Sequence, residues 1–239
     1  MTKGEASLAL SDPLLRHAAR KAGSKSVLVY EELRSAIISL KLEPGTQIDK
    51  AEICDRLEVS RQPLSEALSR LSEERLVTVE PQKGTYVTRI RLSDVVEAAF
   101  VREALEVATV RRIAPDMDDE TIDRLRLIVD YQSAATAAHD IEEFYVLDTR
   151  FHAVLIGKLA FRRVAEAVES ARSHTERIRR LLLPTPRRNP ETIAEHKLIV
   201  AELARKSPAG AAEAMHAHLA NGLNQLHKFA AERPELFEP

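Results

Sequence analysis

The spacing of apolar residues changes after Leu76, and this change constrains the first third of the chain most strongly. Before Leu76, apolar residues recur at helical intervals in three short runs, the last of which covers residues 64–71. After Leu76 the interval falls to two residues on either side of residues 82–84. Residues 27–91 are therefore predicted to form three short helices followed by a β-hairpin.

Residues 92–239 have a helical pattern throughout. Turn-forming residues interrupt the pattern five times, which predicts about six helices of ordinary length. The interruptions fall at Ala114-Pro115, His139-Asp140, Gly157, residues 184–190 and Ser207-Pro208. We expect a mainly α protein in which a winged helix-turn-helix domain (27–91) precedes an antiparallel helical bundle (92–239), with a flexible tail at residues 1–26.

The composition narrows the class of protein. With 239 residues, 44% hydrophobic and 30% charged, the chain can bury a sizeable core and is neither collagenous nor low in complexity. Cys54 is the single cysteine, so no disulfide framework is possible. No apolar run approaches the roughly 18 residues that a membrane span needs, and residues 1–26 have no secretory pattern. We expect a cytoplasmic protein that does not use a membrane.

The predicted third helix has the features of a DNA-recognition helix. Its apolar side would be buried, which leaves Arg61, Gln62 and Ser65 free to enter a major groove. Ser60 is expected to cap this helix, and the Lys83-Gly84 tip of the hairpin is short and cationic. The alternative is a polar helix face that is merely solvated. Residues 27–91 hold 10 Lys and Arg against 11 Asp and Glu, so this module needs a dimer or the tail for affinity.

A second group of residues could bind a metal ion. Asp148 and His152 are four residues apart, which places a carboxylate and an imidazole on one helix face. His196 and His218 lie in the middle of two later helices, and inward side chains of a bundle can converge on one ion. The alternatives are a surface pair at Asp148 and His152 and histidines that serve only packing. The sequence does not separate His218 from the nearby His216.

The N-terminal module resembles the GntR family of bacterial transcriptional regulators. The resemblance rests on YEELRSAII from Tyr30, LEPGT from Leu42, LEVSRQPLSEALSRL from Leu57 and PQKGTYV from Pro81. It implies DNA contacts by Ser60, Arg61, Gln62, Lys83 and Gly84. The chain departs from the family pattern at Ser65, where Arg is usual, at Arg75, where Gly is common, and at Ala51, where Arg is common.

The C-terminal part resembles the ligand-binding domain of the FadR subfamily, called the FCD domain. The resemblance rests on VREALE from Val101, on Asp148 with His152, on EHK at 195–197 and on AMHAHL from Ala214. It implies a divalent metal ion bound by Asp148, His152, His196 and His218, zinc in the first place and otherwise nickel, manganese or iron. It also implies that Arg102 binds the carboxylate of an effector.

Arg102 has a second interpretation, because Glu106 follows it by four residues and the two could form an ion pair within one helix.

Together these observations predict a regulator rather than an enzyme. A homodimer would bind double-stranded operator DNA, and a small carboxylic acid bound beside the metal would modulate that binding, with repression relieved by the effector as the expected mode. Two alternatives use the same four metal ligands. One is a helical metal-dependent enzyme that activates water, and the other is a regulator that senses the metal itself.

Overall fold

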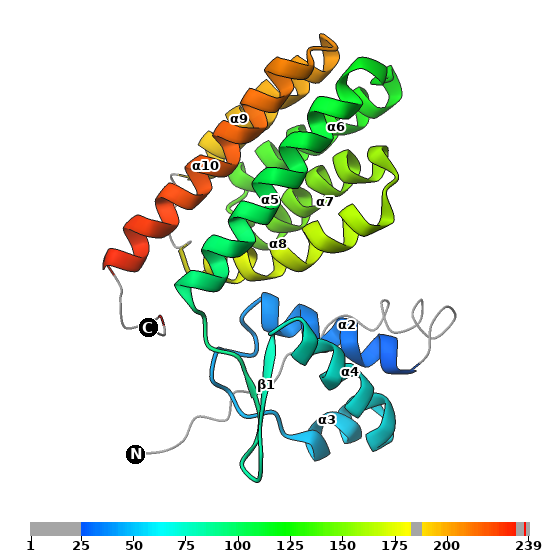
Figure 1. Cartoon of the computed structure of the whole chain (residues 1–239), viewed down its shortest axis with the longest axis vertical. Helices are drawn as coiled ribbons and strands as arrows, with labels where there is room; N and C mark the ends of the chain where they lie inside the picture. Colours follow the sequence, from blue (N-terminus) through cyan, green and yellow to red (C-terminus); the bar gives the residue numbers. More distant parts are fainter. Residues whose placement is uncertain (1–24, 183–187, 233–236, 238–239) are drawn as a thin grey trace. The chain divides into compact units, whose positions relative to one another are not determined.

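The chain folds into two compact units that meet between Arg91 and Leu92. A computed structural model describes residues 25–182, 188–232 and 237 (Figure 1). The predicted flexible tail lies largely outside the described residues, and its last two residues, Lys25 and Ser26, open the first described helix.

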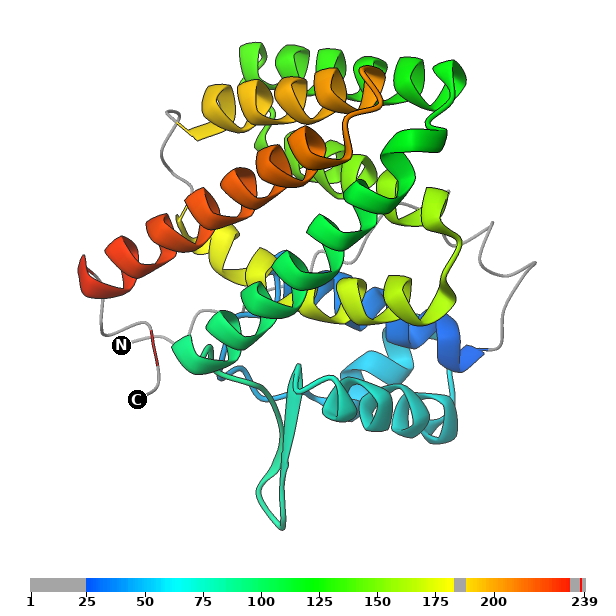
Figure 2. The same ribbon diagram turned by 45° about the horizontal axis from the view of Figure 1, so that its top comes forward.

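From Lys25 onward, the described part of the N-terminal unit contains three helices and one antiparallel hairpin, as predicted. The helices are α2 (Lys25–Ile38), α3 (Lys50–Leu57) and α4 (Arg61–Glu73), and the strands are β1 (Val77–Glu80) and β2 (Gly84–Val87). The strands pair from Val77 with Val87 to Glu80 with Gly84. Gln47 adds an isolated bridge to Tyr86. The hairpin projects away from the helices of its own unit, which is the winged helix-turn-helix arrangement (Figures 1 and 2).

Helix α4 packs on α2 through the leucine stripe that the sequence predicted. Leu64 and Leu71 are buried, as are Leu33 and Ile37 of α2. The helical spacing of Leu33 and Ile37 extends in the sequence to Leu40, but Leu40 lies beyond the end of α2 with φ 60°. Val79 is 56% exposed although Val77 on the same face is buried. The alternation of apolar residues in the sequence therefore continues into a part of the hairpin that no longer packs on the core.

The starts of α3 and α4 differ in how they are capped. Asp49 accepts hydrogen bonds from the backbone N–H groups of Ala51 and Glu52, 2.8 and 3.0 Å long. Ser60 occupies the N-cap position of α4, but its side chain makes no capping hydrogen bond. The expectation that Ser60 caps this helix is therefore wrong, and its hydroxyl is not used for that purpose.

The C-terminal unit is a bundle of long helices with one short 3₁₀ turn, η1 (Ala114–Asp116). Its α-helices are α5 (Leu92–Ile113), α6 (Asp119–Ala137), α7 (Ile141–Leu159), α8 (Arg162–Leu182), α9 (Arg188–Ala204) and α10 (Pro208–Glu232). The interruption expected at Gly157 occurs three residues later, at Ala160 with φ 57°. The mainly α fold with a helical C-terminal bundle is confirmed.

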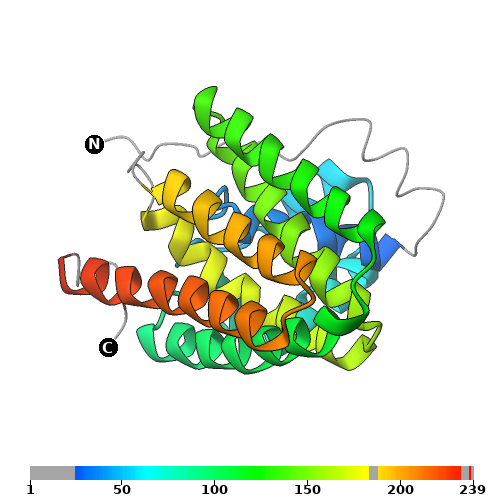
Figure 3. The ribbon, with the colours of Figure 1, turned by 90° about the horizontal axis from the view of Figure 1, so that it is seen from above.

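Helix α5 is central to this bundle. It packs against α10 and α8, while α6 packs against α7 and α9 (Figures 2 and 3). Helices α5 and α10 run antiparallel (Figure 1). The apolar core includes Val110, Leu125, Phe151 and Met215, all fully buried. Among the described residues, no helix is both long and apolar enough to cross a membrane.

The two caps predict different responses to alanine. We expect Asp49→Ala to lower the free energy of unfolding of the N-terminal unit by about 1 kcal/mol, because two backbone N–H groups lose their acceptor. Ser60→Ala should cost less than about 0.5 kcal/mol, since no capping bond is lost. Urea unfolding followed by circular dichroism measures both. A larger loss for Ser60→Ala would contradict the capping difference.

Candidate functional site

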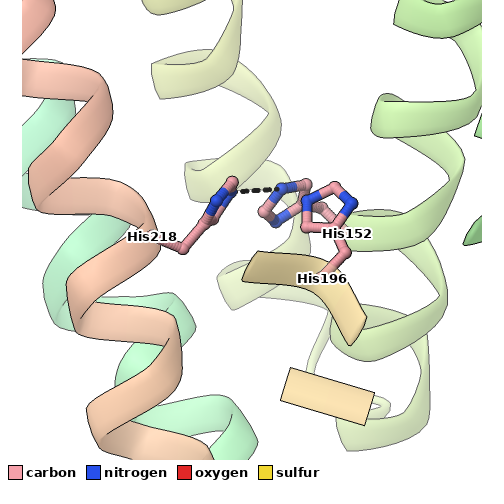
Figure 4. A group of neighbouring side chains, drawn as sticks. All are labelled: His152, His196 and His218. Carbon is pink, nitrogen blue, oxygen red and sulfur yellow. Dashed lines mark hydrogen bonds between the residues drawn. The ribbon is translucent and has the colours of Figure 1, made fainter. Parts of the chain in front are cut away.

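Three histidines from three helices meet in the interior of the C-terminal unit. His152 lies on α7, His196 on α9 and His218 on α10, and all three are buried. One ligand nitrogen from each lies within 4.8 Å of the others. Their rings face a common point, with the Nε2 atoms of His152 and His218 3.3 Å apart (Figure 4).

Each histidine uses its other ring nitrogen, Nδ1, to contact an acceptor outside this group. His152 Nδ1 contacts Glu106 Oε2, His196 Nδ1 lies 2.9 Å from Gln132 Oε1, and His218 Nδ1 lies 2.7 Å from Glu195 Oε2. Phe151 stacks on the His196 ring with centroids 4.0 Å apart. A proton on each Nδ1 satisfies these acceptors and leaves each Nε2 with a lone pair directed at the centre.

The electrostatics of the site favour neutral imidazoles at His152 and His196. Burial lowers the pKa of His152 to about 4, even though Glu106 acts in the opposite direction. Burial, followed by the neighbouring His218, also holds the pKa of His196 well below its usual range. Burial alone would raise the pKa of the Glu106 carboxyl, but Arg102 and His152 outweigh it and keep that pKa low. An anionic Glu106 therefore accepts the proton of a neutral His152.

This arrangement fits a metal ion. The Nε2 atoms of His152 and His218 are within hydrogen-bond distance at 3.3 Å, but with the proton of each ring on Nδ1 neither Nε2 has a proton to donate. Two nitrogens that bind one tetrahedral zinc at about 2.0–2.1 Å are separated by roughly that distance. His196 Nε2 is buried and has no hydrogen-bond partner. Such an atom is costly in a protein core unless something binds it. The donor set of three imidazoles suits zinc and the other divalent ions predicted from the sequence.

Asp148, the fourth predicted ligand, is fully buried at the edge of this group. Its Oδ1 lies 3.7 Å from His196 Nε2. Its Oδ2 accepts hydrogen bonds from Arg179 Nη1 at 2.7 Å and Arg172 Nη2 at 3.3 Å. Burial would raise the pKa of Asp148, but Arg179 outweighs it and keeps this carboxylate charged. The structure thus brings the three histidines together and places Asp148 beside them, bound to two arginines.

Arg102 forms the ion pair with Glu106 that the sequence allowed, and one of its nitrogens is left without a hydrogen-bond partner. Its Nε donates to Glu106 Oε1 over 2.7 Å, which is the ion pair expected within α5. Its Nη1 donates to Thr175 Oγ1 on α8 over 3.3 Å. Its Nη2 is buried with no hydrogen-bond partner. One guanidinium nitrogen is therefore still available to a ligand.

A cavity opens beside this group between α5, α8 and α10. Arg102, Thr175, Arg179 and His218 form its polar lining. The remaining lining residues are small or apolar: Val95, Ala99, Ile178, Leu219, Gly222 and Leu223. A second cavity, between α7 and α8, touches His152 and Arg172. The histidine group is therefore bordered by a cavity on either side.

The predicted DNA-contacting residues lie on the surface of the N-terminal unit. Arg61, Gln62 and Ser65 are exposed in the first turns of α4, and the uncapped Ser60 precedes them. Gln62 Nε2 donates to Glu66 Oε1 over 3.0 Å. A groove beside this helix start is lined by Lys50 and Arg61, among others. Lys50, next to Ala51 where the chain departs from the family pattern, is thus a further cation in this groove.

The tip of the hairpin is held by one contact from the preceding loop and one from within the hairpin. Gln47 Nε2 and Tyr86 Oη both donate to the carbonyl of Lys83 over 3.2 Å. Gly84 has φ 137°, and a Cβ there would lie 2.8 Å from Gln47 Nε2, so only glycine fits. The Lys83 side chain is 73% exposed. The hairpin therefore presents a cation on a fixed backbone.

Comparison with protein families decides the identity. Residues 25–87 match the model of bacterial regulatory proteins of the gntR family, and residues 97–221 match that of the FCD domain. The chain belongs to the GntR family. Arg75, where many members of this family have glycine, has φ 56°, a left-handed conformation that favours glycine. The FCD match is consistent with the FadR subfamily.

Relatives and solved structures of GntR regulators cover nearly the whole chain. A helix-turn-helix regulator from an unstable DNA locus of Streptomyces ambofaciens is 31% identical over 87% of this chain and 88% of its own length. The Escherichia coli repressor RspR is 26% identical over 87% and 92%. A crystal structure of a GntR regulator from Rhodococcus sp. RHA1 has a TM-score of 0.75 at 25% identity over 86% and 99%. These proteins are transcriptional regulators and not enzymes.

Sequence reasoning missed the residues that orient the metal-binding candidates of this GntR regulator. Glu106 was considered only as a partner of Arg102, although it also contacts His152. Glu195 precedes His196 in the quoted EHK motif, yet it contacts His218 instead. His216, which spacing could not separate from His218, has a 57% exposed side chain and lies 2.9 Å from Glu103. Its exposure excludes it from the buried group.

The two glutamates of α5 that contact histidines provide a test of this core. Glu106→Ala leaves Arg102 and His152 buried without their shared acceptor, and we expect the free energy of unfolding to fall by about 3–5 kcal/mol. Glu103→Ala removes the exposed contact to His216 and should cost less than about 1 kcal/mol. Urea unfolding of both variants measures the difference. Equal losses of unfolding free energy in the two variants would show that the buried contacts of Glu106 do not stabilise the protein more than the exposed contact of Glu103.

Proposed function

We propose that this GntR regulator binds operator DNA as a homodimer in the cytoplasm, and that a divalent metal ion and a small organic acid in the FCD domain modulate this binding. The observation that carries the metal proposal is the convergence of three buried Nε2 atoms whose Nδ1 partners fix their orientation. His152, His196 and His218 would hold the ion, with Asp148 Oδ1 as the fourth donor.

The chemistry of a bound metal here would be that of a fixed cation that can also accept an oxygen of an acid. The chain's own residues provide the second contact for that acid. Arg102 Nη2 is buried without a partner, and Arg102 lines the cavity that also touches His218. A guanidinium suits a carboxylate in charge and in shape.

Asp148 connects the proposed metal to this cavity. It binds Arg179, which lines the same cavity as Arg102. A cation near Asp148 Oδ1 would add positive charge beside this cavity, which attracts the carboxylate of an acid. Metal and acid would therefore strengthen each other's binding, and this coupling must be reciprocal.

The DNA-binding part of the proposal assigns the contacts to Ser60, Arg61, Gln62, Ser65, Lys83 and Gly84. Arg61 and Gln62 have the chemistry to address guanine and adenine edges, whereas Lys83 and Ser60 suit phosphate. RspR, the relative from Escherichia coli, is named a repressor. We propose the same sign of regulation for this chain, with release from DNA when the acid binds.

Arg61→Ala is expected to weaken binding to DNA from upstream of the regulator's own gene by roughly 5- to 100-fold, because a base or phosphate contact is lost. Lys83→Ala should weaken binding to all sequences and lower the salt dependence by about one charge. Arg126→Ala, on the exposed surface of α6, is the matched control and should change nothing. Fluorescence anisotropy at several salt concentrations measures all three. Unchanged affinity in Arg61→Ala would remove α4 from the interface.

We expect the histidine variants to lose zinc binding and the Arg102 variant to lose acid binding alone. His152→Ala and His196→Ala should lower zinc affinity by roughly 100-fold or more, since loss even of an outer partner costs about 10–100-fold. Arg102→Ala should retain zinc but lose the rise in melting temperature that organic acids cause. Elemental analysis, zinc titration and thermal unfolding provide the measurements.

Two controls and one alternative complete this test. His216→Ala changes an exposed histidine two residues before His218 and should keep its zinc. Arg111→Ala, on α5, should keep its response to acids. Full zinc content in His152→Ala and His196→Ala would end the metal proposal. If zinc alone released the operator and no acid shifted the melting temperature, the regulator would be a sensor of the metal itself.

A further inference from the structure

We propose that the acid bound by this regulator is a small monocarboxylic acid with an apolar body, rather than a polycarboxylic or polyhydroxylated acid. This inference rests on the proposed acid-binding function and specifies its ligand. It follows from how polar and apolar groups are distributed in the cavity between α5, α8 and α10, and from which of the polar groups are already bonded.

The cavity has a polar end and an apolar end. On α5, Val95 and Ala99 lie about two turns and one turn before Arg102. On the antiparallel α10, Gly222 and Leu223 lie one turn after His218. Because the two helices are antiparallel, going back along α5 and forward along α10 leads in the same direction, away from the histidines. A ligand whose carboxylate meets Arg102 would therefore extend its body between aliphatic side chains.

Most polar groups of the cavity are already bonded within the protein. Arg179 donates twice to the Asp148 carboxylate, over 2.7 and 3.4 Å. Thr175 Oγ1 donates to the carbonyl of Arg172 over 3.1 Å and accepts from Arg102. Among the described residues that line this cavity, Arg102 Nη2 is the buried nitrogen without a hydrogen-bond partner. Arg102 Nη2, beside the proposed metal, is thus the anchor that we assign to the carboxylate.

A second carboxylate or a row of hydroxyls would find no partners along the apolar wall. Burying a polar group without a hydrogen bond weakens binding from roughly fivefold to more than 100-fold. Each methylene placed against the aliphatic wall instead tightens binding by about fourfold. The same cavity therefore discriminates between acids of equal length by the polarity of their bodies.

The second cavity, between α7 and α8, is less suited to this ligand. Its lining includes the carboxylates of Glu166 and Glu169, which repel an anion. The lining of the first cavity contains no acidic residue among those described. Ala99 in the first cavity and Ala153 in the second are alanines on helices that border the histidine group from either side. They form a matched pair for substitution.

The test uses the full-length protein supplied with zinc. It compares monocarboxylic acids of increasing length, and then acids of equal length that differ in polarity. Calorimetric titration with acetate, butyrate and hexanoate should show affinity rising by about fourfold per methylene until the cavity is filled. Hexanoate should bind at least tenfold more tightly than adipate, which has a second carboxylate, and gluconate, which has five hydroxyls. Tighter binding of adipate or gluconate would overturn the inference while leaving acid binding intact. Binding of none of these acids would overturn both.

The paired variants locate the body of the ligand. Ala99→Leu should weaken hexanoate by at least tenfold and leave acetate unchanged, a difference that a folding defect would not produce. Ala153→Leu should leave both acids unchanged. The opposite pattern would place the body in the second cavity and overturn the assignment, as would equal losses for acetate and hexanoate in Ala99→Leu.

Discussion

The C-terminal unit depends on one buried carboxylate that serves two partners. Glu106 accepts a hydrogen bond from Arg102 with one oxygen and contacts His152 with the other. The first contact orients the guanidinium toward the cavity, and the second fixes which nitrogen of His152 carries the proton. Both candidate ligand sites are therefore positioned by the same side chain, which is itself fully enclosed.

The buried carboxylates of this interior are already paired with arginines. Three arginines, Arg102, Arg172 and Arg179, surround the carboxylates of Glu106 and Asp148. Buried charges are tolerated when paired, and removing one partner leaves the other at a large cost. A dication at the histidines would add positive charge to a site whose carboxylates are already paired with arginines. An anionic ligand restores the balance, which is a physical reason for metal and acid to occupy neighbouring positions.

The sequence predicted the elements of the fold more completely than the contacts of the site. The leucine stripe of α4 and the hairpin after Leu76 follow from local periodicity, and both are present. Val79 and Ser60 depart from expectation because exposure and capping depend on where an element sits, which a local pattern does not record. The same reasoning explains Arg75, whose left-handed backbone is set by the chain path before β1.

The histidine group shows where local reasoning ends. The spacing of Asp148 and His152 indicates that they share a helix face, but the approach of His196 and His218 depends on how α7, α9 and α10 pack, and it was anticipated only through family resemblance. Their outer partners, Gln132, Glu195 and Glu106, come from 23 to 64 residues away along the chain. The engagement of Asp148 by Arg172 and Arg179 has no local signal at all. The side chains of α8 can be recognised as hydrogen-bonding partners of Asp148 only from the three-dimensional structure.

In the proposed homodimer, the near-neutral charge of the N-terminal unit would give the ligand site a means of control. Residues 27–91 carry 10 basic and 11 acidic side chains, so a single copy has little of the phosphate attraction on which DNA affinity rests. Two copies held at a fixed separation bind far more tightly than one, because the second contact becomes intramolecular. A strongly basic module would remain on DNA whatever its partner did. In the proposed homodimer, a weak module bound in pairs would respond to any change in the bundle that alters the separation of the pair. Differential affinity of metal or acid for the two arrangements would then be sufficient to switch it.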